Sequence, residues 1–206
     1  MNRSILKLFW LMLILILPAF EVYGSVLSDP GIPDGEQIVW QVTKEGNKST
    51  PSIITWKTGN LDGRPIYQVT TDTGKEKQAT YIIDRSDMRL IEAKVFRNHE
   101  DGKSEVTIEA KGGNQYLVCK EEGEKPKDRE IDRPHDGYDG TILPFCLRGY
   151  PFEKRKEVEM KITPPFKPGV PFWAWRMWKS HARFLGTEKV TVPAGTFDCY
   201  KLKVGA

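Results

Sequence analysis

The chain has 206 residues, with 31 basic and 28 acidic side chains and a formal net charge of +3. The two signs of charge are interleaved, so the composition gives no long-range attraction to nucleic acid, and we expect no nucleic-acid partner. The length suits one domain with a sizeable core, and no shift in composition indicates a second one.

The start of the chain has the order of a secretory signal peptide. Two cations, Arg3 and Lys7, precede the apolar run LFWLMLILIL at residues 8–17. Gly24 is small enough for the pocket of a signal peptidase that holds the residue before the cleaved bond, so we expect cleavage before Ser25. The sequence therefore predicts an exported protein, for which the periplasm is the default compartment.

The alternative is that this segment stays as a membrane anchor. A membrane-spanning helix needs about 20 apolar residues, and the run here is shorter and is broken by Pro18. We therefore expect a signal peptide over residues 1–24, no stable membrane span after cleavage, and a single β domain over residues 25–206.

Short segments that alternate apolar and polar residues, separated by turn-forming residues, follow the Pro/Gly-rich stretch at 29–35. This period of two is typical of strands with one buried face, and the turns between them indicate an antiparallel meander. We expect strands over 37–43, 54–56, 66–71, 81–83, 90–97, 106–110, 116–119 and 157–162, and a hairpin over 187–204.

Two segments interrupt this pattern. Residues 121–134 are charged and nearly free of apolar side chains, which favours a solvated loop or an edge strand. Residues 139–149, with the sequence DGTILPFCLRG, are the one plausible short helix, and we expect it to be a lid or a cross-connection.

The cysteines are Cys119, Cys146 and Cys199, and export would place them where disulfides persist. One bridge with a free buried thiol and three reduced thiols both remain open. Since no two cysteines have a CxxC spacing, redox and zinc chemistry have little support.

The densest aromatic feature is FWAWRMW at residues 172–178. On a strand, Trp173, Trp175 and Met177 would face one side, and Arg176 would lie on the other. These residues are candidate ligand-binding residues for a lipid-like molecule, with Arg176 or Arg183 pairing an anionic head group. The competing interpretation is that the aromatic rings simply fill the core.

Trp40, Trp56 and Tyr67 lie in phase on the early strands, and we expect them to line the same apolar face. Plain core packing is again the alternative. These residues would add apolar volume to a binding site, not chemistry.

No catalytic or metal-binding pattern is convincing. His135 lies near Asp136 and Asp139, but neither the ligand spacing of zinc nor that of calcium is met. The chain has no GxSxG elbow and no Gly-rich phosphate loop. We therefore expect no enzyme activity, no cofactor and no metal, and an enzyme that uses His135 ranks last.

The segment VPAGTF at residues 192–197, between two alternating segments, resembles a motif of the bacterial exported family catalogued as domain of unknown function 3108. The opening DGEQIVW at residues 34–40 is similar to the first strand of that family. In the family, further strands follow the hairpin, so we expect this chain to be a truncated copy of a longer one.

The resemblance implies a mainly β fold: a single strongly curved antiparallel sheet, similar to the open half-barrel of the lipoprotein localisation factors, around one short helical segment. The concave apolar face of such a sheet can hold an acyl chain. We therefore expect a non-enzymatic periplasmic binder of a hydrophobic or lipid-like ligand, such as a lipid or a lipoprotein acyl chain. The alternative is a structural or protein-interaction module of the cell envelope without a ligand cavity.

Overall fold

The computed structural model describes residues 27–40, 43–44, 47–48, 51–74, 77–99, 102–134, 136–140, 142–163, 176–192 and 195–205. The expected signal peptide, Trp173, Trp175 and His135 lie outside these residues. Within them the fold is mainly β, as the alternation predicted. None of the helices in this part of the chain is long and apolar enough to cross a membrane.

The larger sheet has eight strands and is antiparallel throughout, in the order β1-β4-β5-β6-β7-β8-β9-β10. Apart from the step from β1 to β4, neighbours in the chain are neighbours in the sheet, so the expected meander is confirmed. The sheet is open, with β1 and β10 as its edges. Its strands are β1 (Gln37–Trp40), β4 (Ser52–Leu61), β5 (Arg64–Asp72), β6 (Lys77–Asp84), β7 (Leu90–His99), β8 (Gly102–Lys111), β9 (Asn114–Glu121) and β10 (Lys127–Asp132).

The prediction of a single sheet is wrong, because a second sheet of four strands and a two-stranded ribbon are also present. In the second sheet β11 pairs with β12 in parallel, and the other pairs are antiparallel. Alternation identifies strands but carries no information on which strands pair, so it could not separate the sheets. The strands are β11 (Gly137–Asp139), β12 (Glu157–Thr163), β13 (Trp178–Val192) and β14 (Gly195–Gly205), and the ribbon joins β2 (Thr43–Lys44) to β3 (Asn47–Lys48).

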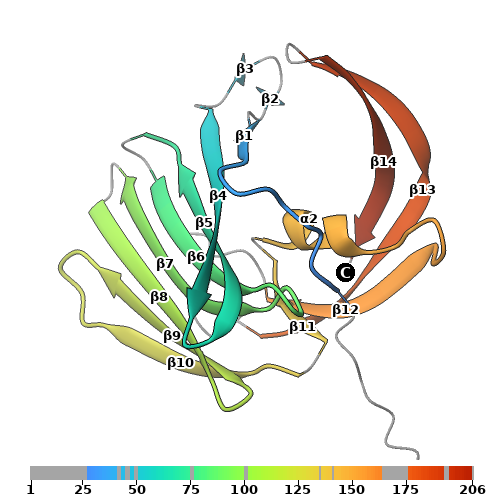
Figure 1. The fold of residues 1–206 in the computed structure, drawn as a ribbon. Helices are drawn as coiled ribbons and strands as arrows, with labels where there is room; N and C mark the ends of the chain where they lie inside the picture. Colours follow the sequence, from blue (N-terminus) through green and yellow to red (C-terminus); the bar gives the residue numbers. More distant parts are fainter. Residues whose placement is uncertain are drawn as a thin grey trace, which may run out of the picture.

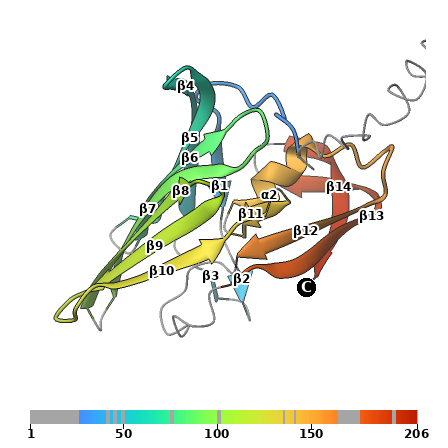
Figure 2. The same cartoon turned by 90° about the horizontal axis from the view of Figure 1, so that it is seen from below.

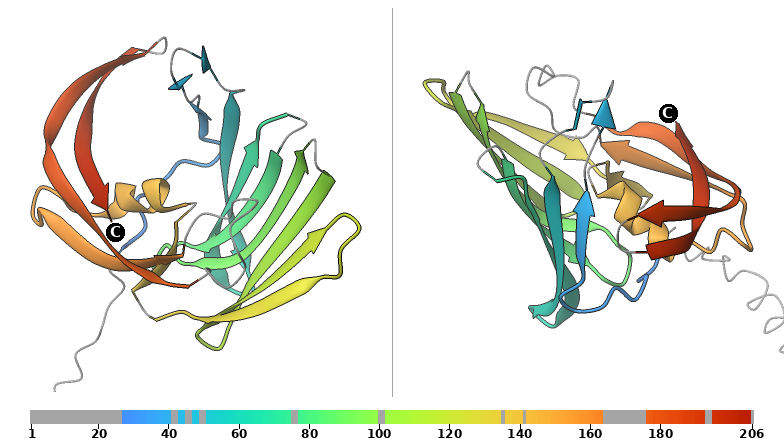
Figure 3. Two further views of the ribbon diagram at one scale, coloured as in Figure 1. Left: turned by 180° about the vertical axis from the view of Figure 1, so that it is seen from behind. Right: turned by 90° about the horizontal axis from the view of Figure 1, so that it is seen from above.

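The two sheets lie on opposite sides of a short helical segment (Figure 1, Figure 3). This segment is α2 (Leu143–Cys146) followed by the 3-10 turn η1 (Leu147–Gly149), inside the range predicted for the helix. Turned by 90°, the molecule shows β11 and β12 beside the end of β10, where the chain passes from one sheet to the other (Figure 2).

The charged stretch at residues 121–134 forms the edge strand β10, one of the two expected alternatives. Five of its six residues are not buried, and only Ile131 faces the core. Along β7 and β8 the alternation is regular, and Ala93, Val95, Val106 and Ile108 are buried. We call the face that carries these side chains, together with Trp56 and Tyr67, the inner face of the large sheet.

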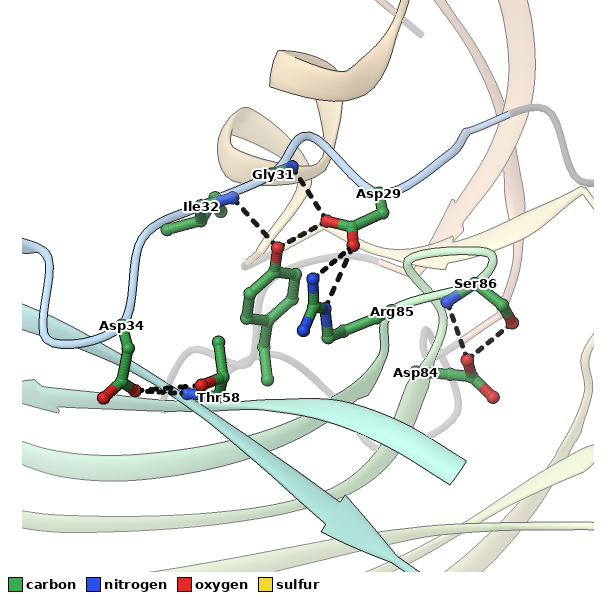
Figure 4. A network of polar contacts seen from close by, with 9 residues as sticks. Asp29, Gly31, Ile32, Asp34, Thr58, Asp84, Arg85 and Ser86 are labelled. Carbon is green, nitrogen blue, oxygen red and sulfur yellow. Dashed lines mark hydrogen bonds and ion pairs between the residues drawn. The ribbon is translucent and has the colours of Figure 1, made fainter. Parts of the chain in front are cut away.

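An extended N-terminal segment, residues 27–36, crosses the inner face and is held there by polar contacts (Figure 4). The Tyr67 hydroxyl donates to Asp29 and accepts from the backbone N–H of Ile32 at 2.9 Å. Arg85 donates to the second carboxylate oxygen of Asp29 at 2.7 Å. Farther on, the Asp34 carboxylate accepts the backbone N–H of Thr58 at 2.7 Å. The segment is thereby attached to β4, β5 and the turn after β6.

These contacts lower the pKa of the Asp29 carboxyl group. Burial tends to raise its pKa, but hydrogen bonds from Tyr67, Gly31 and Arg85 outweigh burial, so the pKa lies below the ordinary value. A depressed carboxyl pKa stabilises the fold at neutral pH, and this contribution is lost as the pH falls through that pKa.

The same segment also contacts the helical turn. The Ser28 hydroxyl donates to the Gly149 carbonyl at 3.2 Å, and Arg148 pairs with Glu36. The approach at Gly149 is so close that a Cβ there would lie 2.0 Å from the Ser28 carbonyl oxygen. Only glycine fits at this position, and the N-terminal segment therefore links η1 to the large sheet.

Gly149→Ala should destabilise the protein by about 1–3 kcal/mol, because the added methyl group forces backbone apart. Equilibrium urea unfolding measures this. The matched control is Gly59→Ala, where a Cβ would meet only the Ile66 side chain at 3.5 Å, and a shift within about 0.5 kcal/mol is expected. Equal effects of the two variants would contradict the close approach.

Tyr67→Phe keeps the buried ring but removes both hydroxyl contacts with the N-terminal segment, one of them to a carboxylate. We expect a loss of about 1–3 kcal/mol in the free energy of unfolding. Tyr116→Phe is the control, since the exposed Tyr116 hydroxyl also donates to a carboxylate, that of Glu130 at 3.0 Å. If both variants lose the same stability, the network around Asp29 has no special role.

Candidate functional site

A pocket of about 280 Å³ lies between the inner face of the large sheet and the start of α2. One wall comes from β4, β5 and β6 with the turn after β5, and the other from residues 140–145. The volume is near the lower end of the roughly 300–1,000 Å³ of ligand pockets. The residues that line it are Ser52, Ile54, Val69, Thr71, Thr73, Lys77, Tyr81, Gly140, Ile142, Pro144 and Phe145.

The apolar wall of the pocket is supported from behind by aromatic packing. The Phe145 ring lies 5.4 Å from the Trp56 ring, and Trp56 lies 5.4 Å from Tyr67, both edge to face. Trp56 and Tyr67 are each 0% exposed. Such packing fixes the position of Phe145, so α2 presents a firm apolar surface to the pocket.

Hydroxyl groups gather at one end of the pocket. The Ser52 and Thr73 hydroxyls share a hydrogen bond of 2.7 Å. The Thr71 hydroxyl oxygen is buried and has no hydrogen-bond partner among the described residues. A buried hydroxyl without a partner costs about 1–3 kcal/mol, so Thr71 is able to gain from a polar group placed in the pocket.

A cation, Lys77, completes this polar end. It stands directly opposite Arg97 in the pairing of β6 with β7, and both side chains point to the inner face. Burial lowers the pKa of Lys77, Arg97 lowers it further, and Asp139 partly opposes the shift. Across the described part of the chain, Lys77 has no ion pair.

Two further ionisable side chains, Tyr81 and Cys146, lie at or beside the pocket. Burial raises the pKa of the Tyr81 hydroxyl and of the Cys146 thiol, which keeps both in their neutral forms. The Cys146 thiol donates to the Met88 carbonyl at 3.5 Å. The residues that the structure describes contain no group of three or more histidine, cysteine or acidic side chains that could hold a metal ion.

The sequence-predicted binding residues whose side chains the structure describes are not among those that line this pocket. Trp56 and Tyr67 lie behind it in the core, so their contact with a ligand stays a prediction. Met177 is half-buried and packs against the core. Arg176 is exposed, and its guanidinium lies 4.1 Å from the centre of the Trp178 ring.

Other expected residues fall partly or wholly outside what the structure describes. Trp173 and Trp175 lie outside the described residues. The backbone of Trp40 pairs with that of Ser52. His135 is outside as well. Its neighbour Asp136 lies 3.5 Å from the Lys161 ammonium, which gives that carboxylate a structural partner.

The sequence interpretation missed Lys77 and Thr71. A signal was present for Lys77, because it is in phase with Ala79, Tyr81 and Ile83 and so had to point to the apolar face. A lysine in phase with apolar residues is unusual in a buried face and indicates a candidate functional position. Thr71 carried no comparable signal, since threonine is common on either face of a strand.

Comparison with known proteins gave no relative: no family model, no curated protein and no solved structure matches this chain. The resemblance to the family catalogued as domain of unknown function 3108 therefore rests on residues 34–40 and 192–197 alone.

The cysteines allow a direct check of burial. All three are free thiols, with Cys119 and Cys146 buried and Cys199 half-exposed on β14. Burial raises the pKa of the Cys119 and Cys146 thiols. We expect a thiol reagent to modify only Cys199 in the folded protein and all three cysteines in denaturant, with the modified sites located by peptide mass spectrometry. Rapid modification of Cys146 in the folded state would contradict this packing.

Proposed function

We propose that this protein is a non-enzymatic, exported binder of a hydrophobic, lipid-like ligand, held between the large sheet and α2. The observation that carries the proposal is the pocket lined by Ile54, Val69, Ile142 and Phe145 with polar groups at one end. Apolar lining with a few convergent polar groups is the usual composition of a small-molecule site. The driving force is burial of apolar surface, worth about 25 cal/mol per Å².

The proposal includes the expectations from the resemblance. A periplasmic protein of the half-barrel type, with a strongly curved sheet, would present the inner face as its ligand side, and a lipid or a lipoprotein acyl chain would be the occupant. The inner face of the large sheet and the helical segment against it support this arrangement. Function does not follow from fold alone, so the pocket must be tested directly.

The helical segment would govern entry to the pocket. Ile142, Pro144 and Phe145 form one wall, and the segment is attached to the N-terminal residues through Gly149 and Arg148. Movement of α2 away from β4 and β5 would open the site without breaking the large sheet.

Binding can be tested with straight-chain alcohols that displace the neutral fluorescent probe phenylnaphthylamine. Each buried methylene contributes about 0.8 kcal/mol, so affinity should rise about fourfold per methylene until the pocket is full. An affinity independent of chain length, or no uptake of the probe, would contradict the proposal and favour an interaction module without a cavity.

A substitution locates the site. Thr71→Phe places a ring in the pocket and should weaken octanol binding about tenfold or more, because the ring takes the place of several methylenes. The matched control is Thr70→Phe, one residue away on the outer face of the same strand, which should leave the affinity unchanged. Equal effects of the two substitutions would place the binding site elsewhere.

A further inference from the structure

Two cations stand side by side on the inner face of the large sheet, where apolar residues are expected. Lys77 and Arg97 are direct partners across β6 and β7. Arg97 is 8% exposed, and Lys77 is half-buried. Like charges placed directly opposite each other on a sheet are destabilising, and burial makes the repulsion stronger.

A buried carboxylate also acts on this region. Asp139 on β11 is 2% exposed, and its charge acts on both Lys77 and Tyr81. Among the described residues that line the pocket, Lys77 is the only charged one, so this lining carries a formal charge of +1. A ligand with one negative charge would make this region neutral.

Resting on the proposed function, we propose that the ligand is a fatty carboxylate whose head group binds the Lys77 ammonium and the Thr71 hydroxyl, while its chain lies against Ile142 and Phe145. The hydrophobic chain alone would not require Lys77, so the proposal adds the chemical class of the ligand to the binding already proposed. Lys77 is then the residue that selects an anion.

The geometry supports this pair of contacts. Thr71 is opposite Ala79, and Lys77 is two residues from Ala79 on the same face, so Thr71 and Lys77 are diagonal neighbours. Such neighbours are about 7–8 Å apart in their backbones, a distance that a lysine side chain can span. An ammonium has three donors and a hydroxyl has one, and a carboxylate accepts from both. The unpartnered hydroxyl of Thr71 would thereby be satisfied.

Other head groups fit less well. A phosphate monoester carries about −1.5 to −2 at neutral pH, which exceeds the single positive charge at the site. An alcohol leaves the charge of Lys77 unbalanced, and a cationic head group adds to the repulsion. A single carboxylate has the charge and the acceptors that this end of the pocket lacks.

The test compares octanoate with octanol and octyltrimethylammonium by displacement of the neutral fluorescent probe from the full mature protein. We expect octanoate to bind about 10- to 100-fold more tightly than octanol, the range of a hydrogen bond to a charged group. The cationic amphiphile should bind most weakly. Lys77→Met should abolish this preference, so that octanoate binds no more tightly than octanol.

Two controls separate a failed inference from a failed fold. Lys94→Met removes a lysine from the exposed outer side of β7 and should preserve the preference for octanoate. Lys77→Met should be at least as stable to urea as the parent protein, because it removes a repulsion.

The outcomes separate the two proposals. Octanol binding as tightly as octanoate would overturn the carboxylate inference and leave the hydrophobic site standing. If neither compound binds, both proposals fall. Selectivity that survives Lys77→Met would also overturn the inference, since the anion would then be recognised by another residue.

Discussion

An open antiparallel sheet has one apolar face that must be covered, and the structure of this protein follows from how that face is covered. The large sheet presents Trp56, Tyr67, Ile83 and Leu117, all almost fully buried, to one side. A second sheet, a helical turn and an extended N-terminal segment together cover them. Burial of these side chains is the dominant favourable term for the fold.

The N-terminal segment is an important part of this cover because it contacts both the large sheet and η1. Asp29 is attached to β5 and to the turn after β6, and Ser28 touches Gly149 in η1. The segment buries Leu27 and Ile32 in the core and adds polar contacts to the large sheet and to η1. The position of α2, and with it one wall of the pocket, depends on contacts made at the start of the domain.

At the pocket, where the inner face is not fully covered, its side chains change from apolar to polar. Trp56 packs against the rings of Phe145 and Tyr67, whereas toward Lys77 the inner face becomes hydroxylic and cationic. Residues that oppose stability are often retained at functional sites, where local consistency of the fold is given up for binding. The pair of Lys77 with Arg97 and the unpartnered hydroxyl of Thr71 are such residues. They lie at the same end of one pocket, and the proposed carboxylate would satisfy both.

The sequence by itself determined most strands of the large sheet and the place of the short helix, because these follow from local alternation and turn-forming residues. For residues 121–134 it left a solvated loop and an edge strand as alternatives, and the structure has the edge strand β10. The phase of Lys77 was also present in the sequence, since Lys77 alternates with Ala79, Tyr81 and Ile83. Only the tertiary structure decided that the strands divide into the large sheet, a second sheet and a ribbon. It also decided that Lys77 lies beside Arg97, Thr71 and α2. These facts depend on strand pairing and on contacts between residues far apart in the chain, such as Ser28 with Gly149, and a local pattern of residue types does not encode such contacts.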